Sequence, residues 1–214
     1  MYFKPYLVGI SGGSASGKTF LLKSLRSAFS SEELTLVSQD NYYKDRNQQT
    51  VHEDGTINFD HPNALNLDLF HDHLKLLIEG QSVKIREYHF NNPQKAPSTV
   101  EYHPAPIIIV EGLFVMYLPQ TRNLVDLKIF VEAEEPIKIF RRAQRDLHER
   151  GYSIENTLSQ YVKHVYPMYR QYIEPVKHFC DFIIPNNESC ATASHVIINH
   201  LQTKVNALVQ QHEE

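Results

Sequence analysis

A glycine-rich segment near the amino terminus carries the clearest chemical signal in the sequence. The stretch GISGGSASGKTF at residues 9–20 fits the pattern G-x-x-x-x-G-K-[ST] through Gly12, Gly17, Lys18 and Thr19. Because glycines lack side chains, the backbone N–H groups of such a loop can surround phosphate oxygens, and Lys18 can reach the terminal phosphates. The hydroxyl of Thr19 is an oxygen ligand of the kind that Mg²⁺ prefers. The pattern therefore predicts a nucleoside triphosphate site, against the alternative of a glycine-rich turn with a surface lysine.

The surroundings of this segment favour the same interpretation. The run YLVGI before the loop reads as a strand, and the run FLLKSLRSAF after it has a helical pattern. The loop would therefore lie at the positive end of a helix. The residues expected to contact the nucleotide phosphates are Gly12, Gly13, Ser14, Ala15, Ser16, Gly17, Lys18 and Thr19.

Short apolar segments alternate with helical patterns along the rest of the chain. The apolarity of these segments is continuous rather than alternating, which indicates strands that are covered on both faces. The expected strands are 7–10, 35–39, 106–112, 127–133 and 181–185, and the expected helices are 17–30, 64–80, 134–149, 154–173 and 190–211. This order predicts an α/β protein with a three-layer, P-loop NTPase-type fold, in which helices flank a parallel sheet.

Two acids are expected at the edge of this sheet where ligands bind. Asp40 follows the second strand in LVSQDNYYKD, and Glu111 closes the apolar strand IIIVEG. A carboxylate at the end of an apolar strand is unfavourable unless it meets a cation or hydrogen-bond donors. We therefore interpret Glu111 as a Mg²⁺ partner beside Thr19. A capping or turn role is the alternative for both acids.

An arginine-rich stretch, RRAQRDLHERG at 141–151, has a helical pattern that places Arg142 and Arg145 on one face. A guanidinium group suits the recognition of phosphates and diols, and an arginine over a transferring phosphate stabilises the charge that develops. Surface ion pairing, for example with Asp146, is the alternative. Residues 141–175 are interpreted as a helical lid that excludes water from the nucleotide.

One segment interrupts the alternation of strands and helices. Residues 83–103 contain two β-leaning stretches around NNPQKAP, which predicts a hairpin that projects from the sheet. No repeat or second domain is apparent, so we interpret residues 1–214 as a single domain. The sequence lacks an N-K-x-D motif, which disfavours a GTPase switch.

The composition restricts the class of partner. The 214 residues carry a formal net charge of −4 with 42% hydrophobic content, which suits a globular domain but not general binding to nucleic acid. Cys180 and Cys190 fit no metal-ligand spacing and no disulfide framework, which favours a reducing compartment. The longest apolar run is broken by Glu111, so we expect a cytoplasmic protein that does not engage a membrane.

Motifs spread over residues 7–188 resemble, in order, the uridine kinase (uridine-cytidine kinase) family. They are GGSASGKT, LVSQDNYYKD, NFDHP, VEGLFVMY, LKIFVEA, RRAQRDLHERG, LSQYVKHVYPMYRQYIEP and DFIIP. The resemblance implies a P-loop nucleoside kinase that uses ATP or GTP with Mg²⁺ to phosphorylate the 5′-hydroxyl of uridine or cytidine. It also implies a homo-oligomer, either a tetramer or a dimer.

The same resemblance implies roles for individual side chains. Asp40 resembles the general base, which would act with Lys18 and Arg145. Residues that resemble nucleoside contacts are Phe59, Asp60, Tyr88, Phe90, Arg142 and Gln160, of which Asp60 and Arg142 would grip the ribose. Those that resemble lid arginines near the phosphates are Arg145 and Arg150, and the expected Mg²⁺ ligands are Thr19 and Glu111. A turn role for Asp60 and core packing of the aromatic rings are the alternatives.

The parts that would read the base depart from the family pattern. The family run Y-D-[FY]-x-x-H is YHFNNP here, so His89 replaces the aspartate and Pro93 replaces the histidine. Tyr152 stands where the family has an arginine after E-R-G, and I-I-P-R-G is IIPNN. Other acceptors therefore stay open, namely another nucleoside, a sugar phosphate or pantothenate. A nucleotide-binding regulator without catalysis is a further alternative, which the presence of Asp40 disfavours.

Overall fold

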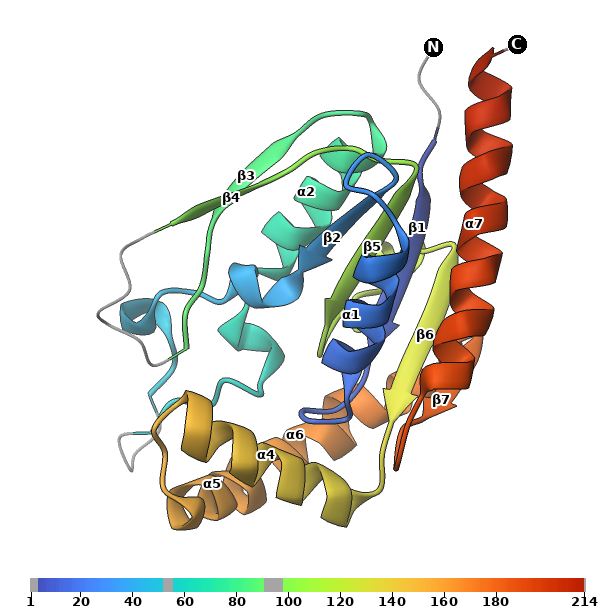
Figure 1. The fold of residues 1–214 in the computed structure, drawn as a ribbon. Helices are drawn as coiled ribbons and strands as arrows, with labels where there is room; N and C mark the ends of the chain where they lie inside the picture. Colours follow the sequence, from blue (N-terminus) through green and yellow to red (C-terminus); the bar gives the residue numbers. More distant parts are fainter. Residues whose placement is uncertain (1–3, 52–55, 91–97, 214) are drawn as a thin grey trace.

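The computed structural model describes residues 4–51, 56–90 and 98–213, and a parallel sheet lies at its centre (Figure 1). The strands of this sheet are β1 (Tyr6–Ser11), β2 (Leu34–Ser38), β5 (Ile107–Gly112), β6 (Leu127–Glu132) and β7 (Phe182–Pro185), in the spatial order β2-β5-β1-β6-β7. All neighbouring strands of the sheet pair in parallel. The predicted α/β class and parallel sheet are therefore confirmed.

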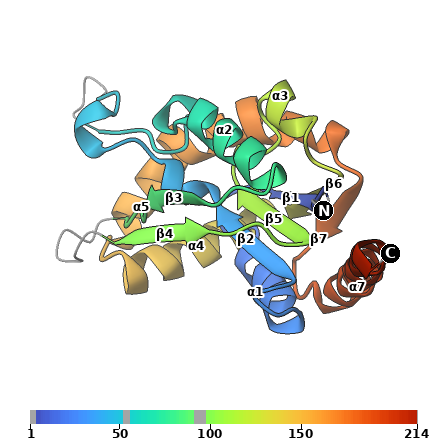
Figure 2. The same ribbon diagram turned by 90° about the horizontal axis from the view of Figure 1, so that it is seen from above.

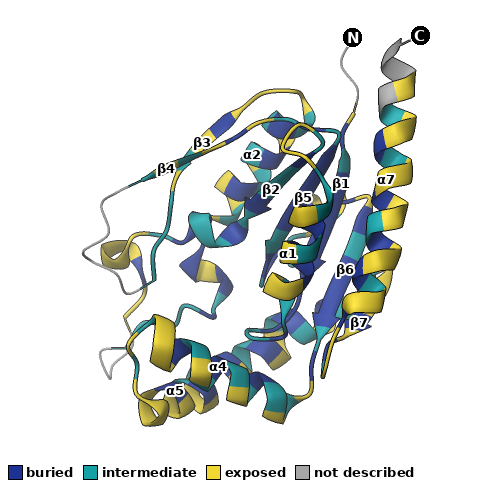
Figure 3. Cartoon of the chain, viewed as in Figure 1, coloured by how far each residue is buried: buried dark blue, intermediate teal, exposed yellow. Residues whose placement is uncertain are grey.

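Helices cover both faces of the sheet, as the view from above shows (Figure 2). Helices α1 (Lys18–Ala28) and α7 (Ala191–Glu213) pack on one face, whereas α2 (Leu67–Ile78) and α3 (Pro119–Arg122) lie on the other. Successive residues of β5 alternate between the two cores, because side chains of a strand point to opposite faces. Ile107 and Ile109 join the α1 and α7 side, while Ile108 and Val110 join the α2 side. The continuous apolarity of the strands follows from this double burial (Figure 3).

The remaining helices lie below the carboxyl ends of the strands. They are α4 (Glu135–Glu149), α5 (Ile154–Gln160) and α6 (Tyr166–Met168), and the arrowheads of β1, β5 and β6 point toward them (Figure 1). Together with the sheet they enclose the edge at which the glycine-rich loop and the two strand-end acids lie. In the described part of the chain, no helix combines the length and the apolar character needed to span a bilayer.

A separate pair of strands lies beside β2 and α2 (Figure 1). Strands β3 (Val83–Arg86) and β4 (Thr99–Tyr102) pair antiparallel, with Val83 opposite Tyr102 and Arg86 opposite Thr99. Both strands fall within the segment for which a hairpin was predicted. Its expected tip, which includes Pro93, lies outside the described residues.

Residues 154–173 are helical throughout, as predicted, but they do not form one continuous α-helix. After α5 the backbone forms π-helical turns at Tyr161–Val165 and Tyr169–Ile173, with the short α6 between them, and then a 3₁₀ helix at Glu174–Phe179. Pro167 lies within α6, and a proline inside a helix lacks an N–H and clashes with the carbonyl four residues earlier. Wider π-helical turns are a common way to accommodate such a disruption.

Asp126 fixes the start of β1 against the start of β6. Its carboxylate Oδ2 accepts a hydrogen bond from Leu7 N at 2.8 Å, and its own N–H donates to Leu7 O at 2.8 Å. Leu7 is fully buried, so its N–H would otherwise lack a partner at this point. Lys4 also lies 3.5 Å from the Asp126 carboxylate, but the side chain of Lys4 is 67% exposed.

The substitution Asp126→Ala is expected to lower the free energy of unfolding by about 1–3 kcal/mol, because it leaves the Leu7 N–H unsatisfied. Denaturation with urea, followed by circular dichroism, measures the change. Lys4→Ala is the matched control and should change stability by less than about 0.5 kcal/mol, since exposed ion pairs contribute little. Equal losses in the two variants would contradict this account.

Candidate functional site

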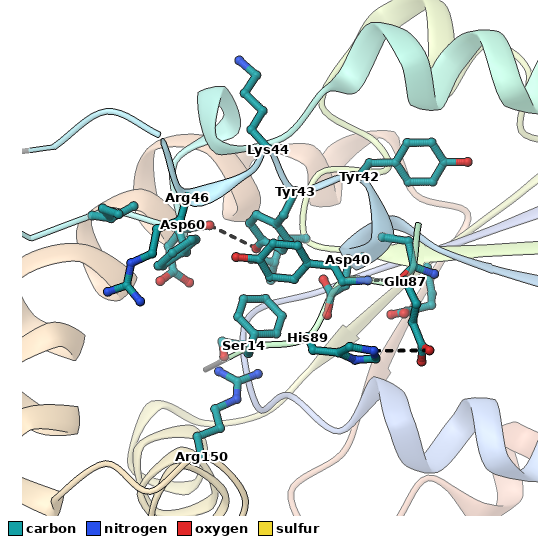
Figure 4. Close-up of a pocket in the computed structure, with 18 of the residues that line it drawn as sticks. Ser14, Asp40, Tyr42, Tyr43, Lys44, Arg46, Asp60, Glu87, His89 and Arg150 are labelled. Carbon is teal, nitrogen blue, oxygen red and sulfur yellow. Dashed lines mark hydrogen bonds and ion pairs between the residues drawn. The ribbon is translucent and has the colours of Figure 1, made fainter. Parts of the chain in front are cut away.

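A cavity of about 870 Å³ opens at the carboxyl edge of the sheet, between the sheet and α4 (Figure 4). It brings together side chains from the glycine-rich loop, the segment after β2, the β3/β4 pair, the end of β5 and α4. The lining residues that the sequence predicted are Ser14, Ala15, Gly17, Lys18, Thr19, Asp40, Phe59, Asp60, Tyr88, Phe90, Glu111, Arg142, Arg145, Arg150 and Gln160. Gly12, Gly13 and Ser16 are buried in the loop beneath it.

The glycine-rich loop adopts a backbone that its glycines make possible. Gly17 has a φ of 96° and lies immediately before α1, which has no side-chain cap. A Cβ on Gly12 would lie 2.2 Å from Val131 O, so the loop packs directly on the end of β6. The loop is therefore tightly fixed at the amino terminus of α1, where N–H groups and the helix dipole favour anions.

Lys18 lies across this loop and faces the two acids. Its Nζ donates hydrogen bonds to Gly12 O at 2.8 Å and Gly13 O at 3.1 Å. Burial lowers the pKa of the Lys18 ammonium group, while the charges of Glu111 and Asp40 oppose that shift. The cation is thus held in a desolvated position by carbonyl oxygens and nearby carboxylates.

The two strand-end acids line the cavity with this lysine, and all three residues are half-buried. Burial raises the pKa of the Asp40 carboxyl, and the charges of Lys18, Arg150 and Arg145 act in the opposite direction. Burial, followed by the charge of Asp40, raises the pKa of Glu111, whose Oε1 accepts a hydrogen bond from Ser38 Oγ at 2.6 Å. The Ser38 hydroxyl also accepts from Asp40 N and so caps the 3₁₀ turn Gln39–Tyr42. Because Ser38 supplies this cap, the carboxylate of Asp40 is not needed for it.

Three arginines, two from α4 and one from the turn after it, line the cavity. Arg142 is buried, donates to Ser14 Oγ at 2.9 Å, and has its Nη1 3.7 Å from Asp60 Oδ1. Arg145 donates to Asp146 Oδ1 from both Nε and Nη2, at 3.0 and 2.8 Å. The ion pair with Asp146 that the sequence offered as an alternative therefore forms, but Asp146 is buried and Arg145 lines the cavity.

Aromatic rings form the far end of the cavity. Phe90 lies 4.9 Å from Tyr88 and 6.1 Å from Phe59, measured between ring centroids, and the guanidinium of Arg150 lies 4.4 Å above the Phe90 ring. Tyr43 joins these rings and donates from its hydroxyl to Phe59 O at 3.0 Å. Gln160 lines the same region while its amide donates to Asn156 Oδ1. Flat apolar walls with cationic and amide groups nearby suit a planar ligand.

Sequence reasoning missed Asn41, which joins the turn that carries Asp40 to the β3/β4 pair. Its Oδ1 accepts a hydrogen bond from Tyr88 N at 3.0 Å, and its Nδ2 donates to the Tyr102 hydroxyl at 2.7 Å. The only sequence signal was its position directly after Asp40. Through these bonds the aromatic wall and the acid keep a fixed relative position.

Sequence reasoning also missed the contacts between the loop after β7 and the glycine-rich loop. Asn186 donates from its side chain to Ser16 O at 3.0 Å, and Arg141 donates to the carbonyls of Asn186 and Asn187 at 2.8 and 3.0 Å. The departure from the family pattern at IIPNN marked Asn186 as unusual, but it did not predict the contact with Ser16. Asn186 thus takes part in holding the shape of the glycine-rich loop.

Two residues that depart from the family pattern, His89 and Tyr152, lie in the described part of the chain. His89 lines the cavity, and its Nε2 lies 3.3 Å from Ser98 Oγ and 3.4 Å from Glu87 Oε2. Tyr152 also lines the cavity, and its backbone N–H donates to Asp146 O at 3.0 Å.

Comparison with known proteins agrees with this geometry. Residues 7–193 match the family described as Phosphoribulokinase / Uridine kinase. The chain belongs to this family. A protein named uridine kinase from Streptococcus thermophilus is 36% identical over 208 residues, which covers 97% of each chain. One of the same name from Streptococcus gordonii is 36% identical over 211 residues and 99% of each chain.

Solved structures of family-like kinases share the fold. Phosphoribulokinase from Rhodobacter spheroides superposes with a TM-score of 0.64 at 16% identity, covering 85% of this chain and 70% of that one. A D-glycerate 3-kinase from Cryptococcus neoformans gives a TM-score of 0.53 at 16% identity, covering 81% and 80%. At these identities the likeness concerns the fold alone. The predicted P-loop kinase fold and family resemblance are confirmed.

The raised pKa of the Asp40 carboxyl leads to a prediction for stability. Because the folded-state pKa of Asp40 is raised, the folded protein holds this proton more tightly than the unfolded chain. The Asp40 carboxyl therefore contributes stability below its unfolded-state pKa, and this contribution is lost as pH rises through its folded-state pKa. Asp40→Asn, which stays neutral, should therefore raise the Tm at pH 8 and leave it nearly unchanged near pH 3.

Calorimetry of the ligand-free protein at both pH values measures this effect. Asp72→Asn, at an exposed position of α2, is the matched control and should change Tm little at either pH. A lower Tm for Asp40→Asn at pH 8 would show that burial does not dominate the energetics of this carboxylate.

Proposed function

We propose that the protein is a nucleoside kinase that transfers the γ-phosphate of ATP or GTP to the 5′-hydroxyl of uridine or cytidine. The observation that carries this proposal is that one cavity contains both the glycine-rich loop and the half-buried carboxylate of Asp40. A loop of this kind binds the donor, and an acid in the same cavity can accept a proton from a hydroxyl acceptor. The uridine kinases to which the chain is similar support the choice of acceptor.

At the donor end, we assign the nucleotide phosphates to the loop from Gly12 to Thr19, with Arg150 nearby. Lys18 is placed to move from the loop carbonyls to the terminal phosphates. The oxygens of Thr19 and Glu111 fit Mg²⁺, because both are hard ligands and the half-buried Glu111 lies near the Asp40 carboxylate, whose charge a cation would balance. Bound there, Mg²⁺ neutralises phosphate charge and orients the terminal group.

At the acceptor end, we assign the ribose diol to Asp60 and Arg142. The two groups lie 3.7 Å apart, and a carboxylate can accept from both hydroxyls while the guanidinium donates to them. Phe59, Tyr88 and Phe90 would flank the base, with Gln160 as a polar contact. Asp40 would then take the proton from the 5′-hydroxyl as that oxygen attacks the γ-phosphate.

The lid supplies charge and excludes water. We assign to Arg145 the stabilisation of charge on the phosphate during transfer, in the region 141–175 that covers the carboxyl edge of the sheet. Exclusion of water favours transfer to the acceptor over hydrolysis of the donor. Rate enhancement would then come chiefly from positioning and from electrostatic stabilisation.

From the resemblance to uridine kinases we further infer a cytoplasmic, homo-oligomeric enzyme, a tetramer or a dimer, that acts in pyrimidine salvage. The single-domain interpretation of residues 1–214, with the segment 83–103 over the acceptor, belongs to the same proposal. The close position of Tyr88 to the turn that carries Asp40 supports that placement of the β3/β4 pair.

Tyr152 favours one second candidate, a related kinase with a different acceptor. It lines the cavity at the position where the family pattern has an arginine, so one cationic donor toward the base is replaced by a phenol. Another nucleoside, a sugar phosphate or pantothenate are the acceptors of this candidate.

A panel of acceptors separates these two candidates. Uridine and cytidine should be phosphorylated with Mg²⁺ and ATP, with adenosine slower, because the cavity ends in a compact set of aromatic rings. Tyr152→Arg should lower the KM for uridine, since it restores a donor near the base. Coupled measurement of ADP formation checks both results. Rapid turnover of pantothenate or a sugar phosphate, with none of uridine or cytidine, would replace the first candidate by the second.

Loss of the proton acceptor gives a second test of the proposed chemistry. Asp40→Asn should reduce kcat by about 10²- to 10⁴-fold, because general base catalysis is removed. Titration calorimetry should show nearly unchanged binding of ATP with Mg²⁺, and Asp72→Asn should retain full activity. A regulator without catalysis would instead show no turnover in the unmodified protein and the same ligand binding in both variants.

A further inference from the structure

Asp146 lies at the centre of the arginine cluster and has no role in the chemistry proposed above. The residue is 1% exposed. Its Oδ1 accepts two hydrogen bonds from Arg145, at 3.0 and 2.8 Å, and lies 3.5 Å from Arg150 Nη1. Its Oδ2 lies 3.2 Å from Arg142 Nε, as an ion pair rather than an aligned hydrogen bond. One buried carboxylate therefore contacts all three arginines.

The backbone of the same residue fixes the turn that ends the lid helix. Asp146 O accepts a hydrogen bond from Tyr152 N at 3.0 Å, across the turn in which Gly151 has a φ of 68°. This bond brings Arg150 back over the cavity, and Figure 4 shows its side chain extending there from the lid. Side chain and backbone of Asp146 thus set the positions of Arg145 and Arg150 together.

The arginines have other carboxylates within electrostatic reach. Arg142 Nη1 is 3.7 Å from Asp60 Oδ1, and both Arg145 and Arg150 act electrostatically on Asp40. In a desolvated cavity, a guanidinium that loses one carboxylate is strongly attracted to the next. If Arg145 or Arg150 paired with Asp40, the guanidinium would occupy the carboxylate and lower its pKa, which makes it a weaker base, and the phosphate would lose a cation.

We propose that Asp146 is a positioning residue that holds Arg145 and Arg150 over the cavity and keeps them from pairing with Asp40. Arg142 has two further anchors, in Ser14 and Asp60, and so depends on Asp146 less. The ribose contacts assigned to Arg142 should consequently survive the loss of Asp146. This inference rests on the proposed function, because it takes the arginines to act on the transferred phosphate.

Asp146→Asn tests the inference, because asparagine keeps the shape and one acceptor oxygen while it removes the charge. We expect kcat with uridine, ATP and Mg²⁺ to fall on the order of 10- to 100-fold, as misplaced groups near a reacting centre do. The KM for uridine should change much less. Glu149→Gln, at an exposed position of the same helix, is the matched control and should behave as the unmodified protein. An unchanged kcat in folded Asp146→Asn would overturn the proposal.

A double-mutant cycle separates positioning from a general structural role. If Asp146 acts through Arg145, kcat of the double variant Asp146→Asn, Arg145→Gln should be close to that of Arg145→Gln alone. Independent, additive losses would overturn the proposal. Asp146→Glu, which restores the charge, should recover part of kcat relative to Asp146→Asn.

Two further measurements keep the outcome clear. Calorimetry reports whether the variants fold, and loss of the folded state in both Asp146→Asn and Asp146→Glu would assign Asp146 to stability and overturn the inference. Binding of ATP with Mg²⁺ should weaken several-fold in Asp146→Asn, and this readout needs no acceptor. If the unmodified protein phosphorylated no nucleoside, the proposed function would fail. The inference would still be tested by the ratio of the ATP affinities of the unmodified protein and Asp146→Asn. Equal affinities would overturn it.

Discussion

Burial of charge at the carboxyl edge of the sheet is the constraint on which the rest of the site depends. Lys18, Asp40 and Glu111 are desolvated there, and burial shifts the pKa of each toward its neutral form. Each group remains tolerable only because the others, together with loop carbonyls and the Ser38 hydroxyl, lie close by. The surrounding elements must therefore hold these groups at fixed positions, and a mobile arrangement would leave buried charge without partners.

The parallel sheet provides that rigidity. Strand β1 lies between β5 and β6, and its register places its last residue, Ser11, beside the last residue of β5, Gly112, and beside Phe130 of β6, which continues to Glu132. The glycine-rich loop, the turn after β2 and the end of β5 leave the sheet from this edge. The strands are packed on both faces, which holds their ends in place. The loops that leave these ends therefore start from fixed positions.

Helix α4 and the β3/β4 pair connect to this edge by polar contacts. Arg142 donates to Ser14 in the glycine-rich loop and lies near Asp60, so it joins two sides of the cavity. Asn41 performs a comparable function between the Asp40 turn and the aromatic wall. Hydrogen bonds of this kind set direction as well as distance, which apolar packing alone does not. The β3/β4 pair also shares the apolar core on the α2 side of the sheet, so its polar contacts add direction to a placement that packing already favours.

The sequence by itself determined the features that depend on neighbouring residues. Gly12 to Thr19 encode the phosphate loop because glycine conformations and a helix start are local, and the apolar strands follow from double burial. The predicted helix at 154–173 is helical throughout, but its π-helical turns on both sides of Pro167 were not predicted. Only the tertiary structure decided which distant groups meet, as in the bond from Asn186 to Ser16, 170 residues apart, or from Arg142 to Ser14, 128 residues apart. Such contacts require the chain to close around the sheet, and no local pattern records which polar side chains that closure brings within hydrogen-bonding distance.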